Sequence, residues 1–520
     1  MEYKKSMIII MLAIFLLSIA GVCASDANDM AIASEDTTPI EMVQSDEISV
    51  NDNNQAIGQS NDEEIISEGN AGTFSELQNN ITAMTGPTLE LDRNYVYDDG
   101  FDTSGIKIDK KITIDGKGYT IDAQGKSRVF NIEASDVTIK NLTIKNANYD
   151  GYGGAVYFAQ SGRAINCNFT NNKATGDDSV GGAIYMYSGT VENCNFTNNK
   201  ATAFDSEGGA ICMYSGTVTN CNFTNCSVTG EYSCGGAICF TSEGNVTNCN
   251  FVNNAASYGD AGAVYFSSGG AVTNCNFINN TATTISFDGT GGAIVFVGTA
   301  TVTNCNFVNN TAFKAGAIYI FSGTVTNCNF TNNSAEYSGG AVFFMNYGNV
   351  ENCNFTDNKA TMGSAIYFYK EYSTDTLTIS NSTFLNNRAN VDDDTPLNVI
   401  INENNITITF MGQNNLLNAI YSCEDAEVTF NNVTYWGANG ITTISSTNPE
   451  SINEAGQNIT VGVVVNDKLV LNDVKVTDEN GAIVLDVKVD GDYYISVRHD
   501  EDSCIAILNH VGLSITFGLM

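Results

Sequence analysis

The sequence predicts an all-β protein in which a parallel β-helix with three strands per coil is followed by a small β-sandwich. The first observation is a repeat. A Gly-Gly-Ala-Ile element, as at residues 181–184, and an Asn-Cys-Asn-Phe element, as at residues 193–196, recur together in nine copies between residues 153 and 390. Successive copies are 23 to 30 residues apart. A fixed element with a variable spacer is typical of a solenoid with one structural unit per repeat.

The second observation is the composition of one repeat. Each copy holds short β-rich runs broken by Gly and Asn, such as residues 183–187, 190–191 and 194–197, without a helical period. No Pro occurs between residues 88 and 394. Three short strands per repeat, stacked at the usual strand separation of about 4.8 Å, form a parallel β-helix. Stacking aligns equivalent side chains, so the copies of Ile184, Met186 and Phe196 are expected to fill the interior as columns.

Asparagines form a third repeated feature. Asn tolerates turn conformations, and stacked amides can hydrogen-bond their copies above and below. Because buried amides usually satisfy one another, we expect a structural ladder at a corner of the coil rather than contacts to a sugar. The ladder residues are Asn166, Asn193, Asn220, Asn248, Asn274, Asn304, Asn327, Asn352 and Asn381.

The cysteines follow the repeat as well. A buried thiol packs as a small hydrophobe, so a reduced column is expected, with disulfides between adjacent coils as the alternative. Cys212 with Cys239, and Cys226 with Cys234, are the better disulfide candidates. No CxxC pair or neighbouring His accompanies the cysteines, so no metal site is expected. The column consists of Cys167, Cys194, Cys221, Cys249, Cys275, Cys305, Cys328 and Cys353, with Ser382 in the ninth copy.

The chain before the repeats divides into three parts. Residues 1–24 have a basic start, an apolar run and small residues before Ser25, which is typical of a secretion signal. Residues 25–70 contain 12 Asp or Glu and no Lys or Arg, which indicates a disordered acidic segment. Residues 71–152 are expected to form an N-terminal cap and the first, less regular coils. A capping box at residues 73–76 predicts a short amphipathic helix that covers the open end of the β-helix.

The chain after the repeats also divides into three parts. Residues 391–442 depart from the repeat but stay strand-rich and are interpreted as closing coils. Residues 443–456 are interpreted as a linker. Residues 457–520 hold alternating runs separated by turn signals, which predicts the small β-sandwich.

The composition limits the partners of this chain. The 520 residues carry a net charge of −36 and the pI is near 4.1. Such a chain repels nucleic acid and anionic membranes. We therefore expect no nucleic-acid partner and no cofactor. The apolar runs outside the signal are too short to span a bilayer, so the chain is not expected to be a transmembrane protein after signal removal.

An aromatic stripe is the candidate binding site. In each Ala-Ile-Tyr-Met-Tyr strand the inward residues leave the residue between them pointing outward. Aromatic faces suit sugar rings, and a long apolar stripe at a surface marks an interaction site. The alternative is a second core layer, covered by loops such as residues 203–207 and 284–290. The candidate ligand-binding residues are Tyr157, Tyr185, Tyr187, Tyr214, Tyr265, Tyr319, Tyr367 and Tyr369.

The repeats resemble those of known surface proteins. Gly-Gly-Ala-Ile with Phe-x-x-Asn, as in residues 196–199, is similar to the repeats of polymorphic outer-membrane adhesins. The layout resembles adhesin-like proteins of methanogenic archaea, through residues 72–78, residues 432–437 and residues 455–461. Over about residues 71–510 this resemblance implies a right-handed, pectate-lyase-like β-helix, an Ig-like C-terminal domain and an extracellular, cell-surface adhesive role.

Two further functions stay open beside adhesion to glycans or partner-cell surfaces. A β-helix can host a polysaccharide lyase, but the repeats hold few basic residues, and the histidines, His499 and His510, lie outside them. We therefore expect that the chain is not an enzyme. A purely structural surface spacer is the other alternative.

Overall fold

The computed structural model describes residues 71–283, 290–369, 376–385 and 387–389, together with separate strands between residues 397 and 519. The predicted signal and acidic segment, residues 1–70, lie outside the described residues. So does most of the predicted linker, although its first residues belong to strand β45 (Gly440–Ser446). Within the described part, strands dominate and pair mainly in parallel.

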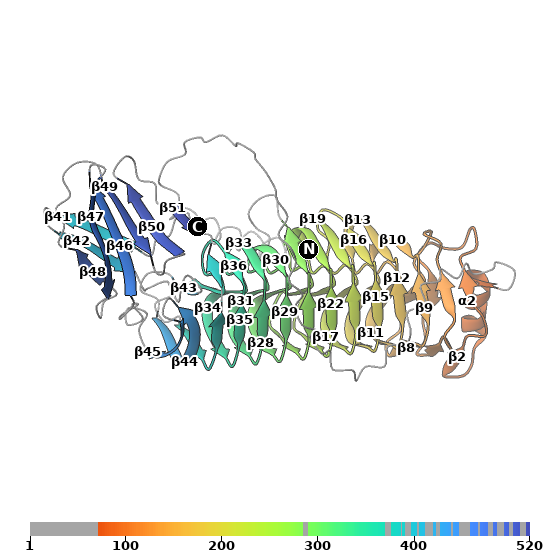
Figure 1. Cartoon of the computed structure of the whole chain (residues 1–520). Coiled ribbons are helices and arrows are strands. Elements are labelled where there is room, and N and C mark those ends of the chain that lie inside the picture. The colour runs from red at the N-terminus through yellow and green to blue at the C-terminus, as the bar shows by residue number, and fades with distance from the viewer. Residues whose placement is uncertain are drawn as a thin grey trace, which may run out of the picture. The chain divides into compact units, whose positions relative to one another are not determined.

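Helix α2 (Phe74–Ala83) caps the first coil. Thr73 is its N-cap, and the reciprocal hydrogen bonds with Glu76 complete the predicted capping box. Phe74 and Leu77 are fully buried and belong to the same hydrophobic core as the coils. The helix therefore covers apolar side chains that the first coil would otherwise expose (Figure 1). No helix in the described part of the chain has the length and apolar character needed to cross a membrane.

The first coils are built from two-residue to four-residue strands that pair in parallel with the strands one coil further along. The register places Leu142, which is buried, one coil before Cys167, as the sequence pattern predicts. These strands are β1 (Gly72–Thr73), β2 (Thr88–Glu90), β3 (Tyr95–Val96), β4 (Ile106–Ile108), β5 (Thr113–Asp115), β6 (Thr120–Asp122), β7 (Phe130–Ile132), β8 (Val137–Lys140) and β9 (Thr143–Lys145).

A regular coil has three strands, but their boundaries differ from the prediction. In the copy that starts at Gly181, the two expected runs after Gly-Gly join into one strand, β14 (Ile184–Glu192), and β15 (Asn195–Thr197) follows after a turn. The third strand, β16 (Lys200–Thr202), comes from the spacer, which the sequence analysis treated as loop. Alternating apolar residues such as Ala201, which is fully buried, explain why this part of the spacer forms a strand.

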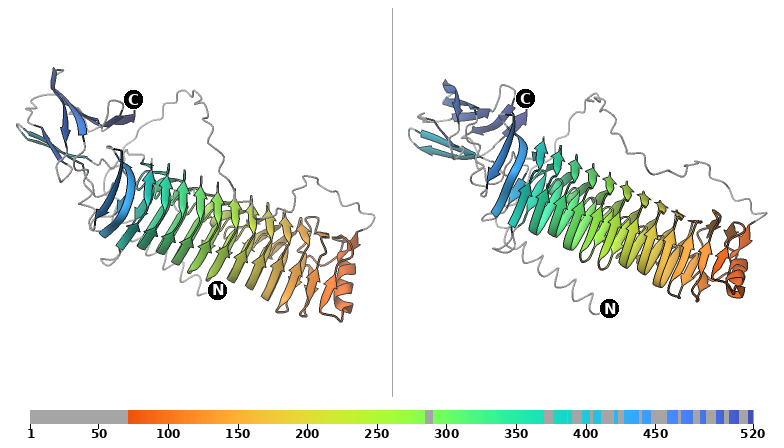
Figure 2. Two further views of the ribbon diagram at one scale, coloured as in Figure 1. Left: turned by 60° about the horizontal axis from the view of Figure 1, so that its bottom comes forward. Right: turned by 90° about the horizontal axis from the view of Figure 1, so that it is seen from below.

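Each strand pairs in parallel with its copy in the next coil, so the coils stack in sequence order (Figures 1 and 2). The strands after Gly-Gly are β11 (Val156–Ile165), β14, β17 (Ile211–Thr219), β20 (Ile238–Phe240), β21 (Gly244–Thr247), β24 (Val264–Phe266), β25 (Gly270–Thr273), β28 (Ile294–Thr303), β31 (Ile318–Thr326), β34 (Val342–Glu351), β37 (Ile366–Phe368) and β38 (Thr376–Ser380). The Asn-Phe strands are β12 (Asn168–Thr170), β15, β18 (Asn222–Thr224), β22 (Asn250–Val252), β26 (Asn276–Ile278), β29 (Asn306–Val308), β32 (Asn329–Thr331), β35 (Asn354–Thr356) and β39 (Thr383–Leu385).

The spacer strands form a separate ten-stranded sheet. They are β10 (Asn148–Tyr152), β13 (Lys173–Val180), β16, β19 (Ser227–Cys234), β23 (Ala255–Asp260), β27 (Thr281–Thr283), β30 (Thr311–Lys314), β33 (Ser334–Ser338), β36 (Lys359–Ala360) and β40 (Arg388–Ala389).

The predicted apolar columns fill the interior. Ile184, Met186 and Phe196 are fully buried, and so are their copies in the next coil. Successive rings of the Phe196 column lie parallel, with centroids 4.7–4.9 Å apart. This spacing matches the separation of stacked strands, so each ring contacts its copies in the coils before and after.

The cysteine column is a chain of thiols, as predicted. The N–H of Cys194 donates to Sγ of Cys221 at 3.4 Å, and Sγ of Cys221 donates to the carbonyl of Thr219 at 3.2 Å. The twelve cysteines that the structure describes are all thiols. The predicted pairing of Cys226 with Cys234 is wrong, because these side chains belong to different hydrophobic clusters.

Several asparagine ladders run along the coils, and two of them differ in burial. The predicted one is exposed rather than buried: Asn193 has a φ of 54° and an exposed side chain. A second ladder, which was not predicted, lies at the position of Asn199, and its members are fully or almost fully buried. In it, Nδ2 of Asn280 donates to the carbonyl of Phe251 and to Oδ1 of Asn310, both at 3.0 Å. The buried ladder comprises Asn172, Asn199, Asn254, Asn280, Asn310, Asn333, Asn358 and Asn387, with Cys226 in one place.

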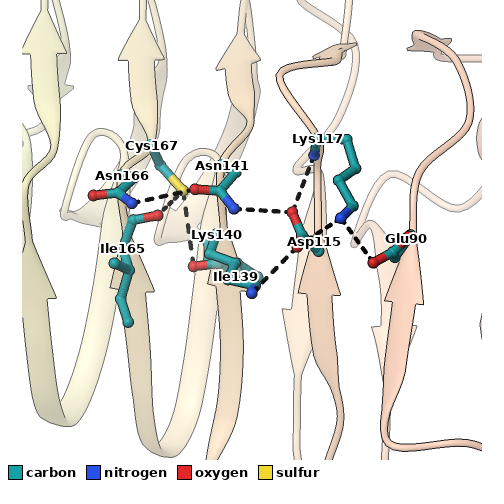
Figure 3. Close-up of polar contacts among 9 residues, drawn as sticks. All are labelled: Glu90, Asp115, Lys117, Ile139, Lys140, Asn141, Ile165, Asn166 and Cys167. Atoms are coloured by element: carbon teal, nitrogen blue, oxygen red, sulfur yellow. Dashed lines mark hydrogen bonds and ion pairs between the residues drawn. The ribbon is translucent and has the colours of Figure 1, made fainter.

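The exposed ladder begins at a charged residue (Figure 3). Asn166 donates to Oδ1 of Asn141 at 3.2 Å, and Asn141 donates to Oδ1 of Asp115 at 3.0 Å. The ammonium groups of Lys140 and Lys117 lie 3.2 and 3.6 Å from Oδ2 of Asp115. Burial opposes ionisation of this carboxyl, but the hydrogen bonds and the nearby cations lower its pKa from 3.8 to about 2. The first link of the ladder is therefore an anion.

The chain beyond residue 390 only partly forms closing coils. Strands β43 (Ile420–Ser422) and β44 (Glu427–Gly437) continue the parallel stacking. Strands β41 (Leu397–Asn402) and β42 (Asn405–Phe410), which were predicted to be closing coils, instead pair antiparallel with each other, and β42 also pairs antiparallel with β48 (Ala482–Leu485). The other C-terminal strands form a five-stranded antiparallel sheet: β46 (Asn458–Val465), β47 (Lys468–Val476), β49 (Tyr493–Arg498), β50 (Ser503–Asn509) and β51 (Thr516–Leu519). Two antiparallel sheets agree with an all-β C-terminal region, and its Ig-like character stays a prediction.

Candidate functional site

The aromatic stripe occupies one outward position of the strand after Gly-Gly. In β14, Ile184 and Met186 point into the core, and Tyr185 between them is half-buried. The register aligns this position through all nine copies. We call it the tyrosine column: Tyr157, Tyr185, Cys212, Cys239, Tyr265, Val295, Tyr319, Phe343 and Tyr367.

The residue before each Gly-Gly pair partly covers this column. Val180 is buried in a small cluster with Cys212 and Cys239, and Tyr185, Cys234 and Tyr265 pack against this cluster. Burial raises the pKa of Tyr185 to about 12 and that of Tyr265 well above its usual value. Every member of the tyrosine column is buried or half-buried, so this position is closer to the second core layer than to an open stripe.

The structure divides the candidate tyrosines into separate groups. Tyr157 and Tyr185 stack at 5.4 Å, at the N-terminal end of the column. Toward the C-terminal end, Phe343 stacks between Tyr319 and Tyr367 at 5.0 and 4.7 Å. Tyr265 lies between these groups, in register with Cys239 on one side and Val295 on the other. The stripe is therefore not one continuous aromatic surface.

The tyrosines two positions further along the strand are more accessible. Tyr187 and Tyr214 are 49% and 45% exposed, and their rings are parallel with centroids 5.2 Å apart. Tyr369, at the equivalent position near the other end, is half-buried. The flat, exposed pair of rings on two adjacent coils is the part of the predicted site that best fits the face of a sugar ring.

A groove of about 600 Å³ opens beside the N-terminal end of the tyrosine column. Tyr157 lines it together with Tyr149 and Tyr152 from β10, and the edge of Tyr152 contacts the ring of Tyr185 at 5.2 Å. The exposed carboxylates of Asp150, Asp177 and Asp178 line it as well. Aromatic faces and hydrogen-bond acceptors thus converge in one hollow, which is typical of a small-molecule site.

Arg128 lines this groove and contacts two of its tyrosine rings. Its buried guanidinium donates to the carbonyls of Gly153, at 2.9 Å, and Tyr152. The same guanidinium lies 3.7 Å from the ring centroid of Tyr149 and 5.1 Å from that of Tyr157, so two cation–π contacts orient the rings. Burial lowers the pKa of Arg128 to about 10, which leaves it charged at neutral pH. It can position tyrosines and attract an acceptor, but it does not supply a base.

Of the groove residues only Tyr157 was predicted from the sequence, and the fold explains why the others were not. Arg128 belongs to an irregular first coil, and Tyr149 to Tyr152 and Asp177 and Asp178 belong to the spacers, where no repeat fixes the alignment. The available signal was the Tyr-Asp-Gly-Tyr run at residues 149–152, directly before the first Gly-Gly.

The comparisons with known proteins agree with this architecture. Residues 178–324 match the family model described as a right-handed beta helix region. Residues 166–186 and 327–344 match the model of the Chlamydia polymorphic membrane protein repeat. No curated protein and no solved structure matches the chain. The matched segments lie within the regular coils, so they support a right-handed β-helix there and a similarity to polymorphic membrane protein repeats.

Proposed function

We propose that this chain is an extracellular, cell-surface adhesin-like protein that binds glycans without altering them. The groove at the N-terminal end of the tyrosine column carries the proposal, because tyrosine faces, carboxylates and a fixed guanidinium meet there on stacked strands. The similarity to polymorphic membrane protein repeats supports the surface role. A repetitive β-helix presents such a site on a rigid support, away from the cell.

The charges favour a particular class of glycan. Asp150, Asp177 and Asp178 offer acceptors for sugar hydroxyl groups, and the tyrosine rings offer apolar faces. The net charge of −36 disfavours polyanionic chains. The proposal is therefore binding of neutral or amino sugars, with the exposed Tyr187 and Tyr214 pair as a second contact.

The test compares two exposed aromatic pairs. The recombinant chain is screened on a glycan array, and each hit is titrated by calorimetry. Replacing Tyr187 and Tyr214 with Ser is expected to weaken binding while the unfolding temperature changes little, because both rings are largely exposed. The matched control replaces Phe204 and Tyr232, another exposed pair in edge contact at 5.2 Å, and is expected to keep full binding. Equal losses in both variants would point to nonspecific stickiness.

A groove variant examines the main site. Arg128 has a structural role, so Asp177→Asn with Asp178→Asn is the better choice, because both carboxylates are exposed. Unchanged affinity in this variant and in the Tyr187 and Tyr214 variant would exclude the proposed surface.

Polysaccharide cleavage is the alternative that needs its own assay. Incubation with a panel of polyuronates, followed by detection of unsaturated products and new reducing ends, separates the two functions. Sustained turnover would reject the adhesin proposal. Binding to no glycan at all would favour a structural spacer.

A further inference from the structure

The tyrosine column changes its chemistry in two adjacent coils. Where the coils before and after carry Tyr185 and Tyr265, these two coils carry Cys212 in β17 and Cys239 in β20. The residue directly before the Gly-Gly pair also changes in these two coils. Backbone bridges align Val180, Glu207 and Cys234 there in successive coils. Two neighbouring positions in two stacked coils therefore form a two-by-two array of Glu207, Cys212, Cys234 and Cys239.

Three of these side chains converge, and the fourth, Cys234, adjoins them through Cys239. Sγ of Cys212 lies 3.5 Å from Oε2 of Glu207, and Sγ of Cys234 lies 3.1 Å from Sγ of Cys239. One ligand atom from each of Glu207, Cys212 and Cys239 lies within 4.8 Å of the others. A tetrahedral zinc ion with bonds of about 2.3 Å to sulfur and about 2.1 Å to oxygen separates its ligand atoms by about 3.6 to 3.8 Å. Glu207, Cys212 and Cys239 therefore lie close enough to share one cation, and Cys234 lies next to Cys239 as the fourth candidate ligand.

The surroundings suit a metal rather than a reactive thiol. Cys212 and Cys239 are buried, whereas Glu207 and Cys234 are half-buried and leave a path from solvent. Val180, Tyr185 and Tyr265 pack around the thiols. A bound cation displaces the thiol protons and pairs with the carboxylate of Glu207.

We propose that Glu207, Cys212, Cys234 and Cys239 form a binding site for a borderline-soft divalent cation of the zinc class, which clamps two adjacent coils. Three thiolates and one carboxylate give four ligands of the types that zinc accepts. A disulfide between Cys234 and Cys239 would account for only two of these groups, whereas the cation accounts for all four. Neighbours along the chain give no sign of this site, because the ligands meet only through the stacking of coils.

The test is a cobalt titration of the full chain under anaerobic, reducing conditions. One equivalent of Co²⁺ is expected to give the visible bands of tetrahedral coordination and a sulfur-to-cobalt charge-transfer band, and Zn²⁺ is expected to abolish both. Zn²⁺ is also expected to raise the unfolding temperature, since a ligand that binds only the folded state stabilises it. Replacing Cys212 and Cys239 with Ser should remove the bands and the shift in unfolding temperature.

The chain supplies a closely matched control. Cys221 and Cys249 lie on the same two coils but in the buried cysteine column, and Ser382 shows that the column accepts Ser. Replacing these two with Ser should leave the cobalt bands intact. A second variant, Glu207→Gln, changes a half-buried group and should weaken cobalt binding without unfolding the coil. The proposal is overturned by the absence of bands, by bands that persist in the Cys212 and Cys239 variant, or by a Cys234–Cys239 disulfide in zinc-loaded protein.

Discussion

The first coils and the regular coils stack in the same way but are linked by different chemistry. Residues 71–152 hold nine of the 22 Lys and Arg, whereas residues 153–390, almost three times as many, hold seven. In the first coils, ion pairs such as Lys107 with Glu133 at 2.9 Å and Lys140 with Asp115 at 3.2 Å connect neighbouring strands. In the regular coils, neutral amide and thiol ladders connect each coil to the next.

The difference shows how repetition constrains charge. A column places identical groups about 4.8 Å apart, so a repeated charge would repel its own copies. An amide has both a donor and an acceptor, and a thiol can both donate and accept, so each can bond to its own copy. The first coils do not repeat their sequence and can alternate charges. Asp115, at the start of the exposed asparagine ladder, marks the change from one chemistry to the other.

The largest effect is expected when a charge enters a buried ladder. Asn280→Asp removes two donated hydrogen bonds, to Phe251 and Asn310, and buries a carboxylate, which should cost about 3–5 kcal/mol. Denaturant unfolding of the full chain measures this cost. Asn306→Asp is the control, because its side chain is exposed and it lies in an outer column, so a much smaller loss is expected. Equal losses of unfolding free energy in the two variants would show that burial is not the reason why the ladders contain Asn rather than a charged residue.

Acid is expected to have the second largest effect, and to act first on the first coils. The pKa of Asp115 is lowered from 3.8 to about 2, so its ionised form stabilises the fold above pH 4. That contribution, about 2 kcal/mol from the size of the shift, is lost as the pH falls from 4 to 2. Pepsin cleavage mapped by mass spectrometry over this range should begin within residues 71–152. Asp115→Asn should reduce this pH dependence, and cleavage that starts in the regular coils would contradict the comparison.

A smaller effect is expected in the thiol ladder. Cys275→Ala removes the acceptor of the N–H of Cys249, at 3.4 Å, and should cost about 1–3 kcal/mol. Cys275→Ser should cost less, because Ser382 makes both ladder bonds in its own coil: it accepts from the N–H of Cys353 and donates to the carbonyl of Ser380. Thermal unfolding of the two variants measures the difference. Equal stability of the Ala and Ser variants would mean that the thiol acts only as an apolar filler.

Salt is expected to give the smallest effect. Several ion pairs of the first coils, such as Lys111 with Asp136, are exposed, and each of these is worth about 0.2–1 kcal/mol. High ionic strength screens them but does not affect neutral ladders. Hydrogen exchange at low and high salt should therefore show slightly faster exchange in residues 106–145 and unchanged exchange in residues 184–356. An equal change of exchange rate with salt in both regions would contradict the distinction between ion-paired first coils and neutral ladders in the regular coils.

The repeat made much of the fold predictable, and its absence explains what was missed. Ile184, Met186 and Phe196 could be assigned to the core because an apolar residue recurs at the same position in every coil. One apolar residue indicates burial only weakly, but its repetition in each copy makes the indication strong. The spacers vary in length, so the sequence alone could not show that Glu207 and Cys234 align, or that Asp150 and Asp177 line one groove. The exposure of the corner ladder was also misjudged, since Asn193 was selected for its positive φ rather than for burial.

The cysteine column has one more consequence, for how the opening of this chain could be timed. Burial raises the pKa of Cys194 far above its usual value, so the thiol stays protonated and shielded, and an alkylating reagent reaches it only when its coil opens. Because eight consecutive coils each carry one such thiol in the same position, pulse-labelling during unfolding would date the loss of every coil separately. The order in which the thiols become labelled would show whether the stack of coils unfolds from one end or from the middle.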